Sequence, residues 1–235
     1  MSAARQSFVG LTLAAAILAG WTGLHVWGVF FHRWTPADWV IVPAVVAVQT
    51  WLSVGLFIVA HDAMHGSLAP GRAGVNRTVG RLALALYAGF WFDRMAPKHH
   101  AHHAGPGSLD DPDFLEAERQ GFWAWYVAFF TRYFGLREFA VLCGAIALYL
   151  LAGASLSNLL VFWAAPALLS SLQLFAFGTF LPHRREAAGF ADEHRARSLG
   201  QPWLVSLATC YHFGGFHLTH HRRPHLPWWR LPSGA

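Results

Sequence analysis

The sequence has little charge and little cysteine for its 235 residues. Only 12% of the residues are charged and 55% are hydrophobic, whereas a soluble domain averages about 25% charged residues. Together with a positive mean hydropathy of +0.35, this scarcity of charge argues against a disordered, fibrous or ordinary cytosolic protein. The two cysteines, Cys143 and Cys210, are too few for a disulfide framework. We therefore expect a membrane protein.

Acidic residues are fewer than basic ones, and the formal net charge is +5. The lysines and arginines lie at the ends of apolar runs, where they would contact phospholipid headgroups. This placement argues against a nucleic-acid partner and for membrane lipids as the surroundings of the protein.

Four apolar runs are long enough, or nearly so, to cross about 30 Å of hydrocarbon as helices. They cover residues 8–31, 39–60, 139–154 and 159–181. Two other segments, Arg77–Phe92 and Gly121–Phe134, are predicted to be helices at the membrane interface, or one of them a further span. The expected fold is one all-α membrane domain over residues 1–235, with four transmembrane helices, a cytoplasmic histidine-rich two-metal cap and one or two interfacial helices.

The basic residues predict the orientation of these spans. Of 17 lysines and arginines, only Arg33 lies in the two loops, 32–38 and 155–158, that would face the exterior. Cytoplasmic loops carry the excess of basic residues. We therefore expect both termini and residues 61–137 in the cytoplasm, with the first run kept as a membrane anchor.

Fifteen histidines are present, and most lie in three clusters on the predicted cytoplasmic side. Within each cluster they are spaced three or four residues apart, which places their rings on one face of a helix. A further histidine follows Pro182 at the end of the fourth run. The clustered histidines, with this additional one, are His61, His65, His99, His102, His103, His183, His217, His220 and His221.

Such clusters favour a metal site over a solvated pH-sensitive loop, because neutral imidazole is a common metal ligand. Nine imidazoles are too many for one ion, since zinc sites saturate at three or four protein ligands. Two metals are the simplest interpretation. A nitrogen-rich site without cysteine is compatible with two alternatives: iron or copper that carries out redox chemistry, or zinc that carries out hydrolysis.

The clusters and their flanking residues resemble the bacterial β-carotene ketolases (carotenoid 4,4′-ketolases), within the membrane fatty-acid desaturase and hydroxylase superfamily. The similar stretches are HDAMHGSL (61–68), FDR (92–94) with DPDF (111–114), FGTFLPHR (177–184), and YHFGGFH (211–217) with PHLPWWRLP (224–232). The chain departs from the ketolase pattern at Thr219, where an acid is expected within the last cluster.

The resemblance implies that the nine histidines hold two irons, and that no other residue is catalytic. It also implies O2 as co-substrate, a ferredoxin-type electron donor and a place in the bacterial inner membrane. Two hydroxylations at C4 of a β-ionone ring, followed by loss of water, would convert β-carotene through echinenone to canthaxanthin. Rings with a 3-hydroxyl group, as in zeaxanthin, would give astaxanthin; acceptance of such rings and the oligomeric state are left open.

Six polar residues near the clusters are candidates for orienting the ligands: Asp62, Asp110, Asp111, Asp113, His212 and His225. For the aspartates, a solvated acidic loop is an equal alternative. For the two histidines, a structural or orienting role is favoured over a role as metal ligands, because ligand histidines are usually oriented by such neighbours. Glu116 and Glu118 are interpreted as solvated. Aromatic residues such as Phe57, Tyr87 and Phe90 are candidates for lining a polyene slot, but none is assigned as a site.

Two other functions remain. A fatty-acyl or alkane desaturase or hydroxylase would use the same metal site. A membrane carrier of metal or haem is disfavoured, because haem needs two axial ligands and transport sites usually lie at mid-membrane.

Overall fold

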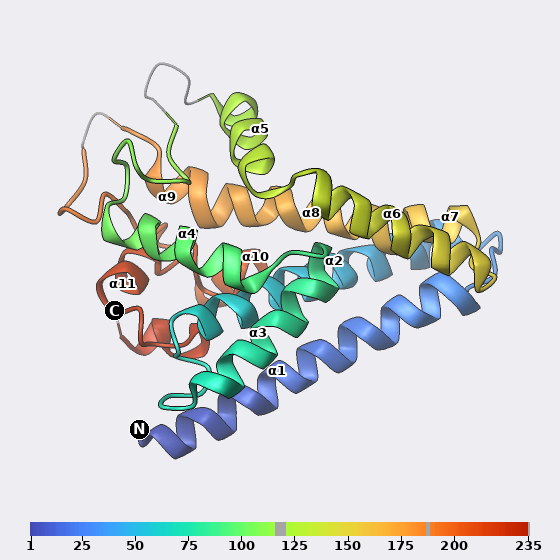
Figure 1. Cartoon of the computed structure of the whole chain (residues 1–235), viewed down its shortest axis with the longest axis horizontal. Helices are drawn as coiled ribbons and strands as arrows, with labels where there is room; N and C mark the ends of the chain where they lie inside the picture. The colour runs from blue at the N-terminus through green and yellow to red at the C-terminus, as the bar shows by residue number, and fades with distance from the viewer. Residues whose placement is uncertain (116–120, 187–188, 235) are drawn as a thin grey trace.

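The computed structural model describes residues 1–115, 121–186 and 189–234, and these residues form helices without strands (Figure 1). The all-helical prediction is confirmed for this part of the chain. The helices in chain order are α1 (Ala3–Val26), η1 (Trp27–Phe31), α2 (Asp38–Met64), α3 (Ala73–Ala88), α4 (Phe92–Ala104), α5 (Phe122–Tyr133), α6 (Leu136–Leu151), α7 (Leu156–Leu159), η3 (Leu160–Ala164), α8 (Ala165–Leu174), η4 (Phe175–Phe180), α9 (Leu181–His183), α10 (Trp203–Cys210), α11 (His217–Arg222) and η5 (Trp228–Ser233).

Three helical segments are long and apolar enough to cross a membrane. They are Ala3–Phe31, Asp38–Met64 and Leu156–His183, and they contain three of the four expected spans. The first and third include π-helical turns, η1, η3 and η4. Such turns are rare in proteins, and those that occur often lie at functional sites.

The helix observed at the expected span 139–154 is shorter than predicted. Helix α6 has 16 residues, or about 24 Å at 1.5 Å per residue, which is shorter than the hydrocarbon core. The preceding helix α5 meets it at an angle of 79°. Glu138 accepts a hydrogen bond from the Gly135 N–H at 3.0 Å, which caps a new helix instead of continuing the old one. The expected interfacial helix Gly121–Phe134 and the expected span therefore form a bent pair, which is a fourth span only if counted as one.

Helix α3 corresponds to the amphipathic segment expected at Arg77–Phe92, displaced by four residues. It ends at Gly89, whose φ of +68° favours glycine. The helix packs along α2 and buries Ala83, Leu84 and Tyr87. The polar face of α3 carries Arg77, which donates a hydrogen bond to Asp93 of α4.

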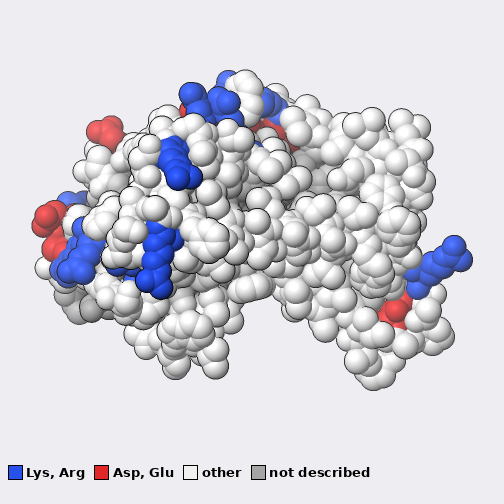
Figure 2. Space-filling view, turned by 90° about the horizontal axis from the view of Figure 1, so that it is seen from below, with Lys and Arg blue, Asp and Glu red and all other residues white. Residues whose placement is uncertain are grey.

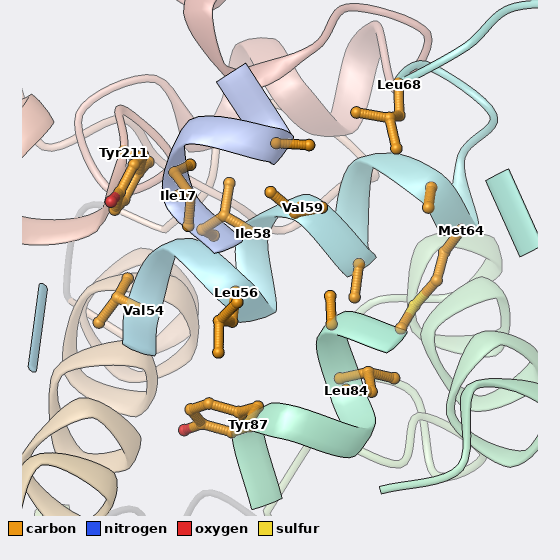
Figure 3. Close-up of a cluster of buried hydrophobic side chains, with 14 of the residues drawn as sticks. Ile17, Val54, Leu56, Ile58, Val59, Met64, Leu68, Leu84, Tyr87 and Tyr211 are labelled. Carbon is orange, nitrogen blue, oxygen red and sulfur yellow. The ribbon is translucent and has the colours of Figure 1, made fainter. Parts of the chain in front are cut away.

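Helix α2 lies at the centre of the hydrophobic core, and its side chains point to several neighbours (Figure 3). Val54 and Leu56 are fully buried, and they lie with Ile17 of α1, Tyr87 of α3 and Tyr211 in one cluster. The outer surfaces differ. Leu136 and Leu151 of α6 are 88% and 85% exposed, as expected for side chains that meet lipid instead of protein.

The long helices run along the same axis, so that the two ends of the molecule are distinct (Figure 1). Both termini, α4, α9 and α11 lie at one end, and the turns before α2 and before α7 lie at the other. Figure 2 shows lysine and arginine gathered toward one end, with a wide uncharged region before a small charged cluster at the opposite end. This distribution is the one on which the predicted cytoplasmic orientation depends; the orientation itself stays a prediction.

Candidate metal centre

Four helices bring the nine predicted histidines to one end of the molecule. His61 lies in the last turn of α2, and His65 directly follows that helix. Helix α9 ends with His183, and α4 and α11 each carry three of the nine histidines. Helix α4 is held on α3 by Asp93, whose carboxylate accepts hydrogen bonds from Arg77 Nε at 2.7 Å and Arg81 Nε at 2.9 Å. The packing of α3 on α2 therefore positions α4 as well.

The nine rings divide into two groups. We call His61, His65, His99, His103 and His220 the five-histidine group, and His102, His183, His217 and His221 the four-histidine group. Within each group, one nitrogen from every ring lies within 4.8 Å of the others. Adjacent residues are separated by this division: His102 and His103 belong to different groups, and so do His220 and His221.

Several ring nitrogens approach each other in pairs. The Nε2–Nε2 distance is 2.7 Å between His65 and His99 and 3.0 Å between His103 and His220 in the five-histidine group. In the four-histidine group, His217 Nε2 lies 2.8 Å from His183 Nε2 and 3.1 Å from His221 Nε2. Two nitrogens bound to one ion at about 2.1 Å and at right angles would be about 3.0 Å apart. The spacing therefore fits two metal ions.

Burial keeps most of these rings neutral, which a metal ligand requires. It lowers the pKa of His65 to about 3 and that of His103 to about 2, with a further lowering by neighbouring histidines. The pKa values of His99, His217 and His220 are well below their ordinary values for the same reasons. Their lone pairs are therefore available at neutral pH. The donor set, nitrogen without thiolate, suits iron, copper or zinc.

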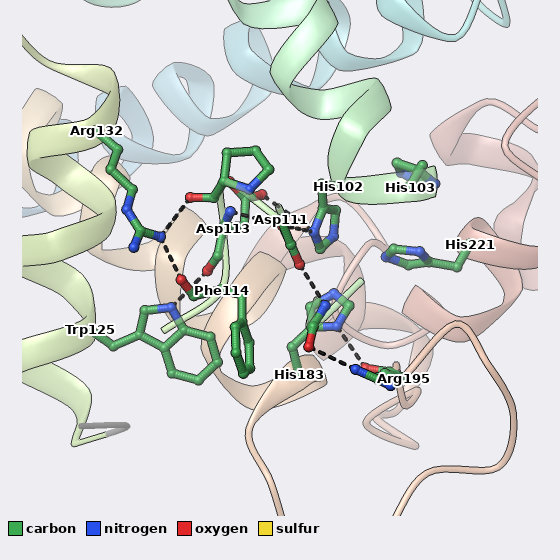
Figure 4. Close-up of polar contacts among 12 residues, drawn as sticks. His102, His103, Asp111, Asp113, Phe114, Trp125, Arg132, His183, Arg195 and His221 are labelled. Atoms are coloured by element: carbon green, nitrogen blue, oxygen red, sulfur yellow. Dashed lines mark hydrogen bonds and ion pairs between the residues drawn. The ribbon is translucent and has the colours of Figure 1, made fainter. Parts of the chain in front are cut away.

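His102 differs, because an aspartate holds its ring (Figure 4). His102 Nδ1 donates to Asp111 Oδ1 at 2.9 Å. Burial lowers the pKa of His102, but the Asp111 hydrogen bond and the charges of Asp113 and Asp111 outweigh it and raise the pKa. Asp111 itself accepts from the Gly107 and Asp113 N–H groups at 2.7 and 2.8 Å. Because Nδ1 of His102 donates to Asp111, Nε2 is the nitrogen that it offers to the four-histidine group.

Three hydrogen bonds that the sequence did not indicate complete this side of the site. His183 Nδ1 donates to the Arg195 carbonyl at 2.8 Å, and Arg195 Nη1 donates to the Gly107 carbonyl at 2.7 Å. Tyr133 donates to the Asp113 carboxylate, which lies 3.9 Å from His102 Nδ1. A backbone carbonyl carries no sequence signal, and Tyr133 is one of several aromatic residues in α5.

The other orienting candidates lie apart from the histidine nitrogens. Asp62 is buried and accepts from the Trp228 N–H at 3.1 Å, which ties the C-terminal segment to α2. His212 contacts Ser206 Oγ at 3.2 Å. Asp110 and His225 are exposed, and neither contacts a ligand ring among the residues described. Glu116 and Glu118 lie outside the described residues. Thr219 is half-buried near Gly234.

A channel leads from the histidines into the helical bundle. Its volume is about 330 Å³, and its walls are mostly apolar side chains of α2, α3, α5 and α8. Phe57, Tyr87 and Phe90 line it, as the sequence suggested. Seven of the nine histidines line the inner end: His61, His99, His102, His103, His217, His220 and His221. The arrangement suits an apolar molecule that presents one end to the metal centre.

The fatty acid desaturase family model matches residues 37–141 and 132–235. The chain therefore belongs to the fatty acid desaturase family. Among curated relatives, it is 46% identical to a beta-carotene ketolase of Paracoccus sp. (strain PC1), over 97% of this chain and 92% of the relative. A beta-carotene ketolase of Paracoccus sp. (strain N81106 / MBIC 01143) is 47% identical, over 95% and 90%.

A zeaxanthin 4-ketolase of Chlamydomonas reinhardtii is 36% identical, over 97% of this chain and 54% of that relative. The resemblance to the bacterial β-carotene ketolases is confirmed by these relatives, and so is the prediction of an oxidoreductase.

Proposed function

We propose that this chain is a β-carotene ketolase that oxidises C4 of β-ionone rings, with two irons, O2 and electrons from a ferredoxin-type donor. The observation that carries the proposal is the apolar channel that ends at both histidine groups. The ketolase relatives support it. The products would be echinenone and then canthaxanthin, and rings with a 3-hydroxyl group would give astaxanthin.

Iron held by the two histidine groups would activate O2 with the donor's electrons, a chemistry that no amino-acid side chain provides. The C4 methylene is allylic, so its C–H bonds are weaker than those of a saturated acyl chain. Two hydroxylations of the same carbon give a geminal diol, and this diol loses water to leave the ketone. In this scheme, no residue needs to act as a separate acid or base.

The protein itself has three tasks in this scheme. The apolar walls of the channel hold the ring and keep water from it. Asp111 and the Arg195 carbonyl accept from Nδ1 of His102 and His183, which leaves each Nε2 free to bind metal. The basic end of the molecule, which we propose faces the cytoplasm of a bacterial inner membrane, would meet an acidic electron donor.

The test is expression in a bacterium that already makes β-carotene, followed by chromatography of the pigments. New echinenone and canthaxanthin are expected. Unchanged carotene beside altered fatty acids would instead support an acyl-chain desaturase or hydroxylase. Metal analysis of the purified protein should give about two irons per chain, and a content well below two, or zinc in its place, would contradict the two-iron proposal.

A further inference from the structure

Thr179 is a buried residue whose hydroxyl group makes no hydrogen bond with the described residues. The residue is 6% exposed, and its Oγ1 has no partner among the described residues. Threonine in a helix commonly donates to the carbonyl one turn earlier, as Thr131 Oγ1 does to the Val127 carbonyl at 2.8 Å. The Thr179 hydroxyl is not among the side-chain atoms that are fully buried without a partner. It can therefore meet a partner in the cavities that the residue lines.

Thr179 lines the channel beside the histidines. It belongs to the π-helical turn η4 and lines the channel together with His102 and Asp113. The same three residues also line a second cavity of about 240 Å³, which Arg195 and Glu186 line as well. Thr179 is therefore at the junction of the two cavities, beside the four-histidine group.

Room for a ligand lies at Gly178, the residue before Thr179. Gly178 also lines the channel, and apart from its neighbours in the chain, a Cβ built on it would meet no atom within 4 Å. An oxygen atom on a ring in the channel could occupy this space without displacing the protein.

The other hydroxyl groups of the channel wall already have partners. Ser170 donates to Tyr87 at 3.4 Å, Ser171 and Tyr126 share a hydrogen bond of 2.6 Å, and Tyr133 donates to Asp113. Within the described lining residues, Thr179 is thus the hydroxyl free to bind a ligand. It can both donate and accept, so it can pair with a hydroxyl or with a ketone.

We propose that Thr179 is a specificity-determining residue that hydrogen-bonds an oxygen carried by the substrate ring at or beside the carbon being oxidised. The inference rests on the proposed ketolase function. The oxygen has two sources: a hydroxyl group already present at C3, or the hydroxyl group placed on C4 by the first oxidation. In either case, Gly178 provides the space and Thr179 the partner.

The test compares T179V, T179S and the wild type in cells that make β-carotene and in cells that make zeaxanthin. Valine keeps the shape and removes the hydroxyl, whereas serine keeps the hydroxyl. T131V is the matched control, because it makes the same change at an exposed position outside the channel. Pigments are quantified by chromatography, and protein in the membrane by immunoblot.

If the C3 oxygen is the partner, T179V should lower ketone formation from zeaxanthin relative to β-carotene by about 3–10-fold, the worth of one hydrogen bond. If the C4 oxygen is the partner, T179V should accumulate 4-hydroxylated pigment from β-carotene. In both cases, T179S restores the wild-type pattern and T131V does not alter it.

An active T179V enzyme with the wild-type ratio and no 4-hydroxylated pigment would overturn the inference. Should T179V fail to accumulate, G178A decides, because alanine suits a helix and its methyl group would fill the space at this position. G178A should shift the zeaxanthin-to-β-carotene ratio or accumulate 4-hydroxylated pigment; the wild-type pattern in G178A would overturn the inference. A wild-type protein that makes no ketocarotenoid on either substrate would refute the proposed function instead.

Discussion

The two histidine groups are similar in composition but are held in different ways. In the four-histidine group, His102 is anchored by a carboxylate and His183 by a backbone carbonyl. In the five-histidine group, no ring donates to a carboxylate or carbonyl among the residues described, and Nδ1 of His61 and of His220 is buried without a partner. Hydrogen bonds to a carboxylate or a carbonyl therefore orient two rings of the first group. Its other two rings, His217 and His221, have a buried Nδ1 without a partner, as His61 and His220 have in the second group.

This difference has a chemical consequence. A hydrogen bond to a carboxylate raises the basicity of an imidazole and fixes its tautomer. A metal in the four-histidine group would therefore meet a more strongly donating ligand in His102 than any ligand of the five-histidine group. We therefore expect the two groups to bind metal ions with different affinities, although both consist of imidazole rings.

The largest effect is expected from replacing His220 or His221, which are adjacent in the chain but belong to different histidine groups. H220A removes one histidine of the five-histidine group, and H221A one histidine of the four-histidine group. Each should lower ketone formation by more than about 100-fold, since even residues that only orient ligands are worth about 10–100-fold. Iron analysis should show about one ion lost in each variant. Two ions retained in both variants would show that the groups are not separate sites.

The Asp111 carboxylate should matter next. D111N keeps the shape but removes the charge that faces His102, and it should lower activity or metal affinity by about 10–100-fold. The effect should fall on one of the two ions, which a titration with a chelator can resolve. D110N is the matched control, because the exposed Asp110 lies beside it in sequence; equal losses in both variants would contradict the anchoring role.

A smaller effect is expected for Y133F. This change removes the hydroxyl that donates to Asp113 and so acts on the four-histidine group through one more residue. The loss of one hydrogen bond should lower turnover by about 2–10-fold. The iron content should stay at the wild-type level, whereas a loss of iron as large as that of D111N would place Tyr133 closer to the metal than the structure does.

The smallest effect concerns the attachment of α4 to α3. Hydrogen bonds from Arg81 and Arg77 hold the pKa of Asp93 below its ordinary value. Such a carboxylate stabilises the fold above its unfolded-state pKa of about 3.9, and the contribution is lost as the pH falls through the folded-state pKa. D93N should therefore slightly lower the unfolding temperature in detergent near pH 7 and should match the wild type once Asp93 is protonated.

High salt should reduce the D93N difference, because the pair is exposed. An equal difference at all pH values would mean that the charge of Asp93 is not what holds the helix.

Much of the fold could be predicted from apolar length alone. A helix that crosses lipid must satisfy its own backbone hydrogen bonds, so a long uncharged run has one stable structure. Three spans were found on this basis. The run at residues 139–154 corresponds to α6, which makes a bent pair with α5 and is a fourth span only if the pair is counted as one. The bend itself could not be predicted, because the cap at Gly135 and Glu138 is a local interaction that hydropathy does not report.

The sequence by itself determined that the chain is helical, lies in a membrane and gathers nine histidines at one end, because helical spacing and basic loops are properties of neighbouring residues. It also determined the membership of the fatty acid desaturase family through its motifs. Only the tertiary structure decided which histidines share a site, since His220 and His221 point to different partners although they are adjacent. Asp111 could be separated from Asp110, and Thr179 recognised as unpaired, only once segments distant in the chain were packed together.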